Sequence, residues 1–205
     1  MITYIRHLPH RFKKMYKKYL FMKYAECGEN LSIGQGANIS IEKESSIKIG
    51  NNCDILGMLI AKCGSKITIG NYTTIRGNSV IGSAEGITIG NHVIISNNVH
   101  IYDNNNHPTP PHERLRLCES GFYSDLWHWK HSESAAINIE DNVWIGERAT
   151  ILKGVSIGHG SIIACDSVVT KAIPPNSIAA GNPAKVVKKI DSENKKNNEN
   201  ERGFY

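Results

Sequence analysis

The chain has 205 residues, of which 40% are hydrophobic, and its formal net charge is +5, values that agree with one compact domain. They argue against a membrane-spanning protein, since no transmembrane helix is found, and against a nucleic-acid-binding protein, since the basic excess is local and lacks a recognition motif. The five cysteines are odd in number and have neither metal nor redox spacing: Cys27, Cys53, Cys63, Cys118 and Cys165. The apolar run at 19–22 is too short for a signal peptide, so we expect reduced thiols and a cytoplasmic protein.

Residues 1–26 are expected to form a basic amphipathic helix. Apolar and basic side chains recur on two faces at helical spacing: apolar Ile5, Leu8, Phe12, Met15, Tyr16, Tyr19 and Leu20, and basic Arg6, Arg11, Lys13, Lys14, Lys17, Lys18 and Lys23. We expect this helix to cover the first coil of the repeat that follows, because repeat proteins need capped ends. A second interpretation stays open beside the first: contact with anionic lipid headgroups, which would place the protein peripherally at the inner membrane face.

A six-residue repeat runs through residues 27–190. An aliphatic β-branched residue occupies every sixth position in two runs: Ile69, Ile75, Ile81, Ile87, Val93 and Val99, then Ile139, Ile145, Ile151, Ile157, Ile163 and Val169. This period is neither that of a helix nor that of a single strand. It predicts an all-β fold, a parallel β-helix in which three hexads close one coil and the branched side chains stack inward. Residues 191–205, which have little to bury, are predicted to be a disordered tail.

Small residues mark the predicted corners of the coils. The pairs Gly70-Asn71, Gly90-Asn91, Asp141-Asn142 and Gly158-His159 closely follow inward aliphatic residues. Glycine and asparagine reach positive φ at the least cost. We therefore expect these pairs to supply the positive φ that a tight corner requires.

The repeat is interrupted at 102–136 by a long polar loop that contains three prolines. Such a loop cannot belong to the stack, and sites are often built on loops that a rigid scaffold carries. His107 lies near its start. An imidazole can take a proton from a hydroxyl while that oxygen attacks a carbonyl, so His107 is the candidate general base. The local sequence leaves an alternative open, a merely exposed histidine beside a proline.

Several motifs occur together from His107 onward. They are His107-Pro108 with His112-Glu113-Arg114-Leu115, the run 142–146, and the ending at 169–176 and 180–185. With the repeat, they make residues 31–190 resemble the hexapeptide-repeat acetyltransferases, in particular the galactoside and maltose O-acetyltransferases and the capsule or lipopolysaccharide O-acetyltransferases. The resemblance implies a left-handed β-helix, a homotrimer with sites between subunits, and acetyl-CoA as the donor.

The resemblance also implies roles for individual residues. His107 matches the general base of the family, and Trp144 matches a tryptophan beside the cofactor. Gly146, in the same run, is taken as a further cofactor-binding residue. The positions that approach CoA correspond to Cys165, Thr170, Lys171, Lys185 and Lys188. Lysines at these positions can supply positive charge to the phosphates of CoA. The alternatives are a solvated face for the lysines and simple packing for Trp144.

The acceptor is expected to be a hydroxyl of a sugar or surface polysaccharide. Where galactoside-type enzymes carry Asn-Phe-Asn, this chain has Arg76-Gly77-Asn78, and its loop is longer. The added stretch is rich in aromatic and polar side chains suited to stacking on sugar rings: Phe122, Tyr123, Trp127, His128, Trp129 and Lys130. We take Asn78, Trp127 and Trp129 as candidate acceptor-binding residues. Alternatively, the aromatic residues pack the loop onto a neighbouring subunit.

We expect direct transfer of the acetyl group without a metal, but alternative functions stay open. The γ-class carbonic anhydrases share the left-handed β-helix and hold zinc at a trimer interface, and His107 and His112 could be two ligands. A third histidine is missing from the expected upstream coil, where His92 and His100 are the nearby candidates. Further alternatives are a non-catalytic scaffold and, within the family, acetylation of an amino sugar, a serine or a small xenobiotic.

Overall fold

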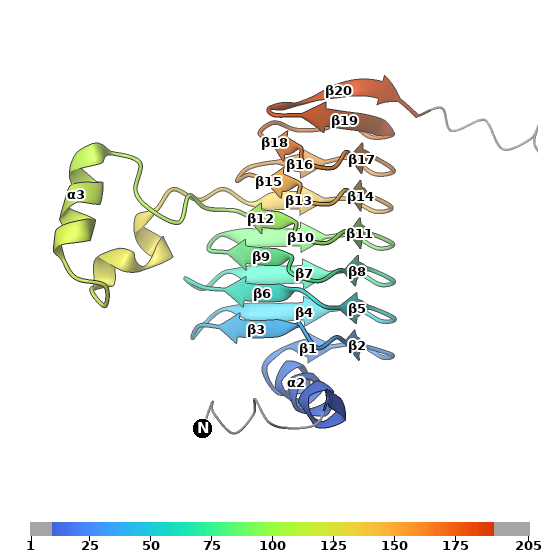
Figure 1. The fold of residues 1–205 in the computed structure, drawn as a ribbon, viewed down its shortest axis with the longest axis horizontal. Helices are drawn as coiled ribbons and strands as arrows, with labels where there is room; N and C mark the ends of the chain where they lie inside the picture. The colour runs from blue at the N-terminus through green and yellow to red at the C-terminus, as the bar shows by residue number, and fades with distance from the viewer. Residues whose placement is uncertain (1–9, 191–205) are drawn as a thin grey trace, which may run out of the picture.

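The protein, described by a computed structural model at residues 10–190, is a solenoid of short parallel strands (Figure 1). Successive strands lie in turn on three sheets, named A, B and C. Sheet A contains β1 (Glu26–Cys27), β4 (Ser46–Ile49), β7 (Lys66–Ile69), β10 (Gly86–Ile89), β13 (Ile137–Ile139) and β16 (Ser156–Ile157). Sheet B contains β2 (Ser32–Ile33), β5 (Asp54–Ile55), β8 (Thr74–Ile75), β11 (Ile94–Ile95), β14 (Trp144–Ile145), β17 (Ile162–Ile163), β19 (Ser177–Gly181) and β20 (Ala184–Lys189). Sheet C contains β3 (Asn38–Ile41), β6 (Met58–Ala61), β9 (Val80–Ser83), β12 (His100–Tyr102), β15 (Thr150–Ile151) and β18 (Val168–Val169).

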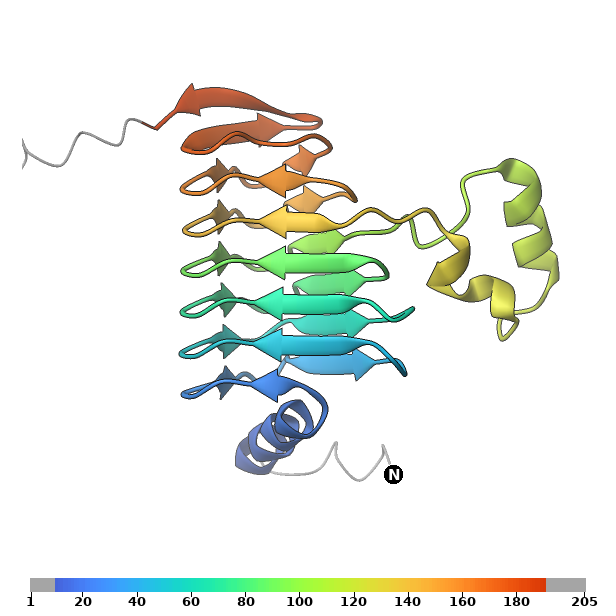
Figure 2. The same ribbon diagram turned by 180° about the vertical axis from the view of Figure 1, so that it is seen from behind.

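The coils wind in the left-handed sense. In Figure 2 the strands nearest the viewer, those of sheet A, run from right to left while the chain climbs from the helix at the base. The predicted fold class, a left-handed parallel β-helix with an N-terminal helix and a long excursion, is confirmed.

The predicted hexad residues form the core. All twelve positions of the two runs are at most 2% exposed. Parallel pairing stacks inward residues of successive coils: Ile69 pairs with Ile89, and Ile139 with Ile157. The second pair is separated by three hexads, as predicted, whereas the coil from Ile69 to Ile89 is two residues longer than three hexads. Stiff β-branched side chains suit this arrangement, because identical rotamers stack with few voids.

The prediction about the corners is wrong at three of the four pairs. Asn142 does have a positive φ of 57°, but elsewhere the positive φ falls on the residue after the pair: Tyr72, His92 and Gly160. Gly70 is needed for a different reason, because a Cβ there would lie 2.6 Å from the carbonyl carbon of Gly90 in the next coil. At these corners the glycine therefore permits close approach of the coils, and a later residue provides the turn.

The helix α2 (His10–Tyr24) covers the base of the solenoid (Figure 1). Phe21 is only 1% exposed and packs into the hydrophobic core. Lys17 Nζ donates a hydrogen bond to the carbonyl oxygen of Ala37. This is the expected capping arrangement. Residues 1–9 of the predicted helix and the predicted tail at 191–205 lie outside the described residues.

Three edges run along the solenoid where the sheets meet. The AB, BC and CA edges consist of the corners that follow strands of sheets A, B and C, respectively. The strands stop at Tyr102 and resume at Ile137, and the chain between them leaves the CA edge as an excursion. This excursion contains the helix α3 (Pro111–Glu119) and the 3-10 turns η1 (Asp125–Trp127) and η2 (Trp129–His131).

Candidate functional site

His107 lies on the excursion, close to the point where it leaves the CA edge. Its side chain is exposed, and its backbone N–H donates to the carbonyl oxygen of Asn105 at 2.7 Å. The indole of Trp127 meets the imidazole edge to face, with ring centroids 5.6 Å apart and an interplanar angle of 89°. The ring of Phe122 also contacts this indole, with ring centroids 5.3 Å apart. The excursion thus folds back and holds an accessible imidazole.

A buried carboxylate anchors the start of the excursion. Asp103 is fully buried and accepts hydrogen bonds from Ser83 Oγ at 2.6 Å and from three successive backbone N–H groups, those of Ala84 (2.7 Å), Glu85 (3.0 Å) and Gly86 (2.7 Å). A buried charge persists only when it is well hydrogen bonded, and these donors satisfy it. This role is not predicted from the sequence. The only signal was an aspartate at the position where the hexads stop.

Trp129 packs on the protein's own coils. Its ring meets that of Tyr102 edge to face at 5.9 Å, and Lys62 Nζ lies 5.0 Å from its centroid. A Cβ on Gly82 would lie 3.0 Å from the indole, so this glycine makes room for it. These contacts give Trp129 a packing role within one chain, where the sequence analysis had considered either the acceptor or a neighbouring subunit.

The end of the excursion is held by a small charged cluster. Asp125 accepts from His131 Nε2 at 2.8 Å and pairs with Lys130 Nζ at 2.6 Å. The hydrogen bond from Lys130, followed by that from His131, lowers the pKa of Asp125 to about 2. Asp125 is therefore ionised at any physiological pH.

Trp144, Gly146 and Cys165, which are predicted to bind the cofactor, lie on sheet B and the BC edge. Trp144 is 47% exposed, and its Nε1–H donates to Ser96 Oγ at 3.2 Å. Cys165 is exposed at a corner above it, whereas Gly146 is buried, and a Cβ there would lie 2.7 Å from the backbone nitrogen of Cys165. Close packing of the coils therefore accounts for a glycine at this position. Asn78 is exposed at the same edge, two coils lower.

A bidentate ion pair, which the sequence analysis did not single out, lies beside Cys165. Arg148 Nε and Nη2 donate to the two carboxylate oxygens of Asp166 at 2.7 and 2.8 Å. The pair lowers the pKa of Asp166 and raises that of Arg148. It bridges two coils and fixes the shape of the BC edge next to the exposed thiol.

The predicted lysines lie near the C-terminal end of the solenoid. Lys185 and Lys188 are exposed on β20, the last strand of sheet B, which pairs with β19. Thr170 and Lys171 are exposed on the CA edge, directly after β18. This edge is also the origin of the excursion that carries His107.

The predicted residues therefore fall into two sets on different sides of one chain. His107, Trp127, Thr170 and Lys171 belong to the CA edge, while Asn78, Trp144 and Cys165 belong to sheet B and the BC edge. Figure 1 shows β14 and β17 on the side of the solenoid opposite the excursion. The structure does not bring the imidazole and Trp144 together within one chain.

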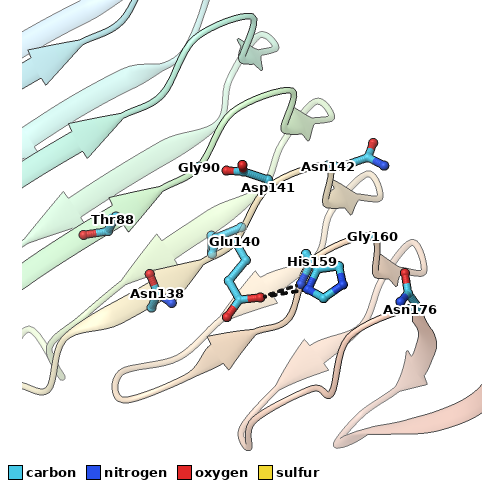
Figure 3. A pocket seen from close by; sticks show the side chains of 10 residues that line it. Thr88, Gly90, Asn138, Glu140, Asp141, Asn142, His159, Gly160 and Asn176 are labelled. Carbon is cyan, nitrogen blue, oxygen red and sulfur yellow. Dashed lines mark hydrogen bonds and ion pairs between the residues drawn. The ribbon is translucent and has the colours of Figure 1, made fainter.

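One hollow lies on the solenoid away from the candidate site, and another lies beside His107. The first has a volume of about 640 Å³ and is formed by sheet A and the AB edge (Figure 3). Within it, Glu140 accepts a hydrogen bond from the backbone N–H of His159. Its lining contains none of the predicted residues and consists of Thr88, Gly90, Asn138, Ile139, Glu140, Asp141, Asn142, His159, Gly160 and Asn176. The second, of about 320 Å³, lies within the excursion beside His107: it is lined by Pro108, Glu113, Arg116, Leu117, Leu126 and His131.

The histidines considered as metal ligands do not converge in one chain. His92 stacks on Tyr72 at the AB edge, with centroids 5.2 Å apart, and His112 is exposed on α3 beside Glu113. Within residues 10–190 of a single chain, no group of three or more His, Cys, Asp or Glu side chains is placed to hold a metal ion. Over the same residues, no helix has the length and apolar character needed to cross a bilayer.

Two family models match the chain. "Hexapeptide repeat of succinyl-transferase" matches residues 66–103, and "Bacterial transferase hexapeptide (six repeats)" matches residues 136–171. A predicted acetyltransferase of Schizosaccharomyces pombe is 58% identical over 57 residues, which are 28% of this chain and 28% of that protein. A predicted acetyltransferase of Staphylococcus aureus is 56% identical over 61 residues, 30% of this chain and 31% of that protein. The matched segments thus span less than a third of these relatives.

Solved structures resemble the chain over most of its length. The polySia specific acetyltransferase NeuO is 28% identical, with a TM-score of 0.62, over 85% of this chain and 87% of that one. A hexapeptide-repeat acetyltransferase of Vibrio cholerae in complex with acetyl coenzyme A is 24% identical, with a TM-score of 0.58, over 86% and 78% of the two chains; at this identity it supports the fold alone. The chain thus contains the hexapeptide repeat at residues 66–103 and 136–171, and it is similar in fold and in part of its sequence to hexapeptide-repeat acetyltransferases.

Proposed function

We propose that the protein transfers an acetyl group from acetyl-CoA to a hydroxyl of a carbohydrate acceptor. The observation that carries this proposal is the exposed imidazole of His107, which Trp127 holds beside the hollow of the excursion. The similarity to NeuO, an acetyltransferase specific for polySia, favours a glycan as the acceptor. All five cysteines are free, as expected in a reducing compartment, so we place the reaction in the cytoplasm.

The site is proposed to form between two copies of the chain. His107 and Trp144 lie on opposite sides of one solenoid, and only a second copy can bring a BC edge against a CA edge. Repeating this heterologous contact around an axis parallel to the solenoids closes a ring, and we propose the homotrimer that the resemblance implies. Sheet C of each copy then faces the centre of the ring.

The donor is proposed to lie along this interface. Trp144 offers a half-exposed indole, and Cys165, one coil above it, is exposed on the BC edge. Lys185 and Lys188 supply positive charge from one copy, and Lys171 supplies it from the CA edge of the other copy. Charge-assisted contacts of lysine with phosphate contribute about 1.5–3 kcal/mol each.

The reaction is proposed to proceed without a covalent intermediate. His107 removes the proton from the acceptor hydroxyl as its oxygen attacks the thioester carbonyl carbon, and a tetrahedral oxyanion forms. When this intermediate collapses, the C–S bond breaks, and the imidazolium returns its proton to the CoA thiolate. The products are the acetyl ester and free CoA.

The acceptor is proposed to enter through the excursion. The hollow beside His107 offers a carboxylate on Glu113 and a guanidinium on Arg116, together with apolar walls at Leu117 and Leu126. Sugars are bound by such combinations of a few polar groups and apolar surface. Asn78 of the neighbouring copy is proposed to face the same space across the interface.

The test is a mass-spectrometric screen of acetyl-CoA reactions against sugars, nucleotide sugars and glycan fragments, scored by the gain of one acetyl group. For an acceptor found in this way, His107→Ala is expected to lower kcat at least about a hundredfold, while CoA affinity measured by calorimetry stays within about twofold. His112→Ala, which changes an exposed histidine on α3, is the matched control and should retain turnover.

Two results would contradict the proposal. Unchanged turnover in His107→Ala would remove the general base. Acetylation found only on amines across the panel would replace the hydroxyl acceptor with an amino sugar.

A further inference from the structure

The helix α2 has an apolar stripe that stays exposed while another face of the helix covers the first coil. Phe12, Met15, Tyr19 and Met22 follow one another at spacings of three and four residues, so they lie on one face of the helix. Their exposed fractions are 55%, 60%, 56% and 55%. Phe21, which faces the first coil, is 1% exposed. The helix therefore has two apolar faces, and only one is covered by the solenoid.

The stripe is exposed at the base of the solenoid, and at its border Met22 and Lys18 also line a hollow against residues 27–31 of the first coil. Figure 1 shows α2 beneath β1 and β2 at the end of the solenoid, far from β20. Exposed large apolar side chains that gather in this way mark an interaction surface. Spacings of three and four residues suit both a partner helix and the plane of a bilayer.

Charge decides between these two occupants. The helix carries no acidic residue over its 15 positions. Lys18 and Lys23 flank the stripe on its two sides, and both are exposed. If two copies of α2 packed in parallel along the stripe, these lysines would occupy the g and e positions that face each other, and like charges there oppose pairing. The same two lysines complement a negatively charged surface.

We propose that α2 docks the protein on an anionic phospholipid bilayer, with Phe12, Met15, Tyr19 and Met22 entering the interface and Lys18 and Lys23 contacting the headgroups. Helices that lie in the membrane plane combine apolar and basic faces in this way. Phe21 remains in the core, so the helix docks without uncapping the solenoid. In the proposed homotrimer, symmetry places three such helices at the same end, and their binding adds through avidity.

The experiment is co-sedimentation of the full chain with vesicles of phosphatidylglycerol and phosphatidylcholine, compared with vesicles of phosphatidylcholine alone. Wild type is expected to bind the anionic vesicles, and less so as salt is raised. Lys18→Glu/Lys23→Glu is expected to bind at least about thirtyfold more weakly, which corresponds to about 2 kcal/mol for two basic residues near the surface. Lys43→Glu/Lys66→Glu, an equal charge change on the flank of the solenoid, is the matched control and should bind as wild type does.

A second variant tests the stripe itself. Met15→Ser/Met22→Ser changes two exposed side chains, so the fold is expected to survive, as circular dichroism can verify, and binding to anionic vesicles should fall. Absence of wild-type binding, or equal binding to both vesicle types, would overturn the proposal. The proposal would also be overturned if Met15→Ser/Met22→Ser bound vesicles as wild type does but had a lower molecular mass in light scattering. That result would mean that a second copy of the chain covers this face. None of these measurements uses acetyl-CoA or an acceptor, so their outcome is separate from that of the proposed transfer.

Discussion

Replacing Trp127 tests whether this ring holds the imidazole or binds the acceptor. The indole meets His107 edge to face at 5.6 Å, and pairs of this kind are worth about 0.5–1.5 kcal/mol beyond the area they bury. If that energy keeps His107 in its productive orientation, Trp127→Ala should lower kcat by about two- to tenfold and leave KM for the acceptor nearly unchanged. The assay is release of the CoA thiol at saturating acetyl-CoA with varied acceptor.

Trp127→Phe is the matched control for this prediction. It keeps a ring against the imidazole and removes an Nε1–H that is buried and has no hydrogen-bond partner among the described residues. Phenylalanine should therefore restore most of kcat without loss of stability. A rise in KM with unchanged kcat in Trp127→Ala would refute the positioning role and return Trp127 to the acceptor-binding residues.

Three further substitutions have distinct expected results. Gly90→Ala places a Cβ 2.7 Å from the backbone nitrogen of Asp141, so overpacking should destabilise the fold by about 1–3 kcal/mol in urea titrations, and an unchanged midpoint would argue against the close coil approach. Asp103→Ala leaves three backbone N–H groups without their acceptor, and each unpaired group costs about 1–3 kcal/mol of stability. The variant should therefore unfold at a lower urea concentration and exchange its amide hydrogens at 84–86 faster. Exchange at the wild-type rate there would show that the anchor is dispensable. Asp125 has its pKa lowered to about 2 by Lys130, so its contribution to the order of the excursion is full above about pH 4 and is lost as the pH falls towards 2. Asp125→Asn should abolish this acid transition in tryptophan fluorescence, and a wild-type transition in the variant would disprove the assignment.

The stack of coils could be predicted because its signal is periodic. Every sixth residue from Ile139 to Val169 is buried, and no other regular structure has this period. Handedness did not follow from the period, because the inward positions are the same for either sense of winding. It came from the resemblance and is visible in the coils themselves.

The corners and the excursion were less predictable, for a physical reason. Gly70 was expected to supply positive φ, but its lack of a Cβ serves contact with the next coil, and contacts between coils are invisible in a local pattern. The role of Asp103 likewise depends on backbone groups 17 to 19 residues earlier in the chain. Trp127 and Trp129 look alike in the sequence, yet one contacts His107 and the other packs on Tyr102, because the path of a loop is set by such distant contacts.

The division of the candidate site between two edges is most directly tested by complementation in mixed assemblies. His107→Ala disables the CA edge, and Trp144→Ala/Cys165→Trp disables the BC edge, so each variant alone should retain about a hundredth of wild-type activity or less. When the two variants are co-expressed in equal amounts, about one interface in four joins an intact CA edge to an intact BC edge, which predicts recovery to about a quarter of wild-type activity. Activity of the mixture that stays at the level of the single variants would contradict a site shared between copies of the chain.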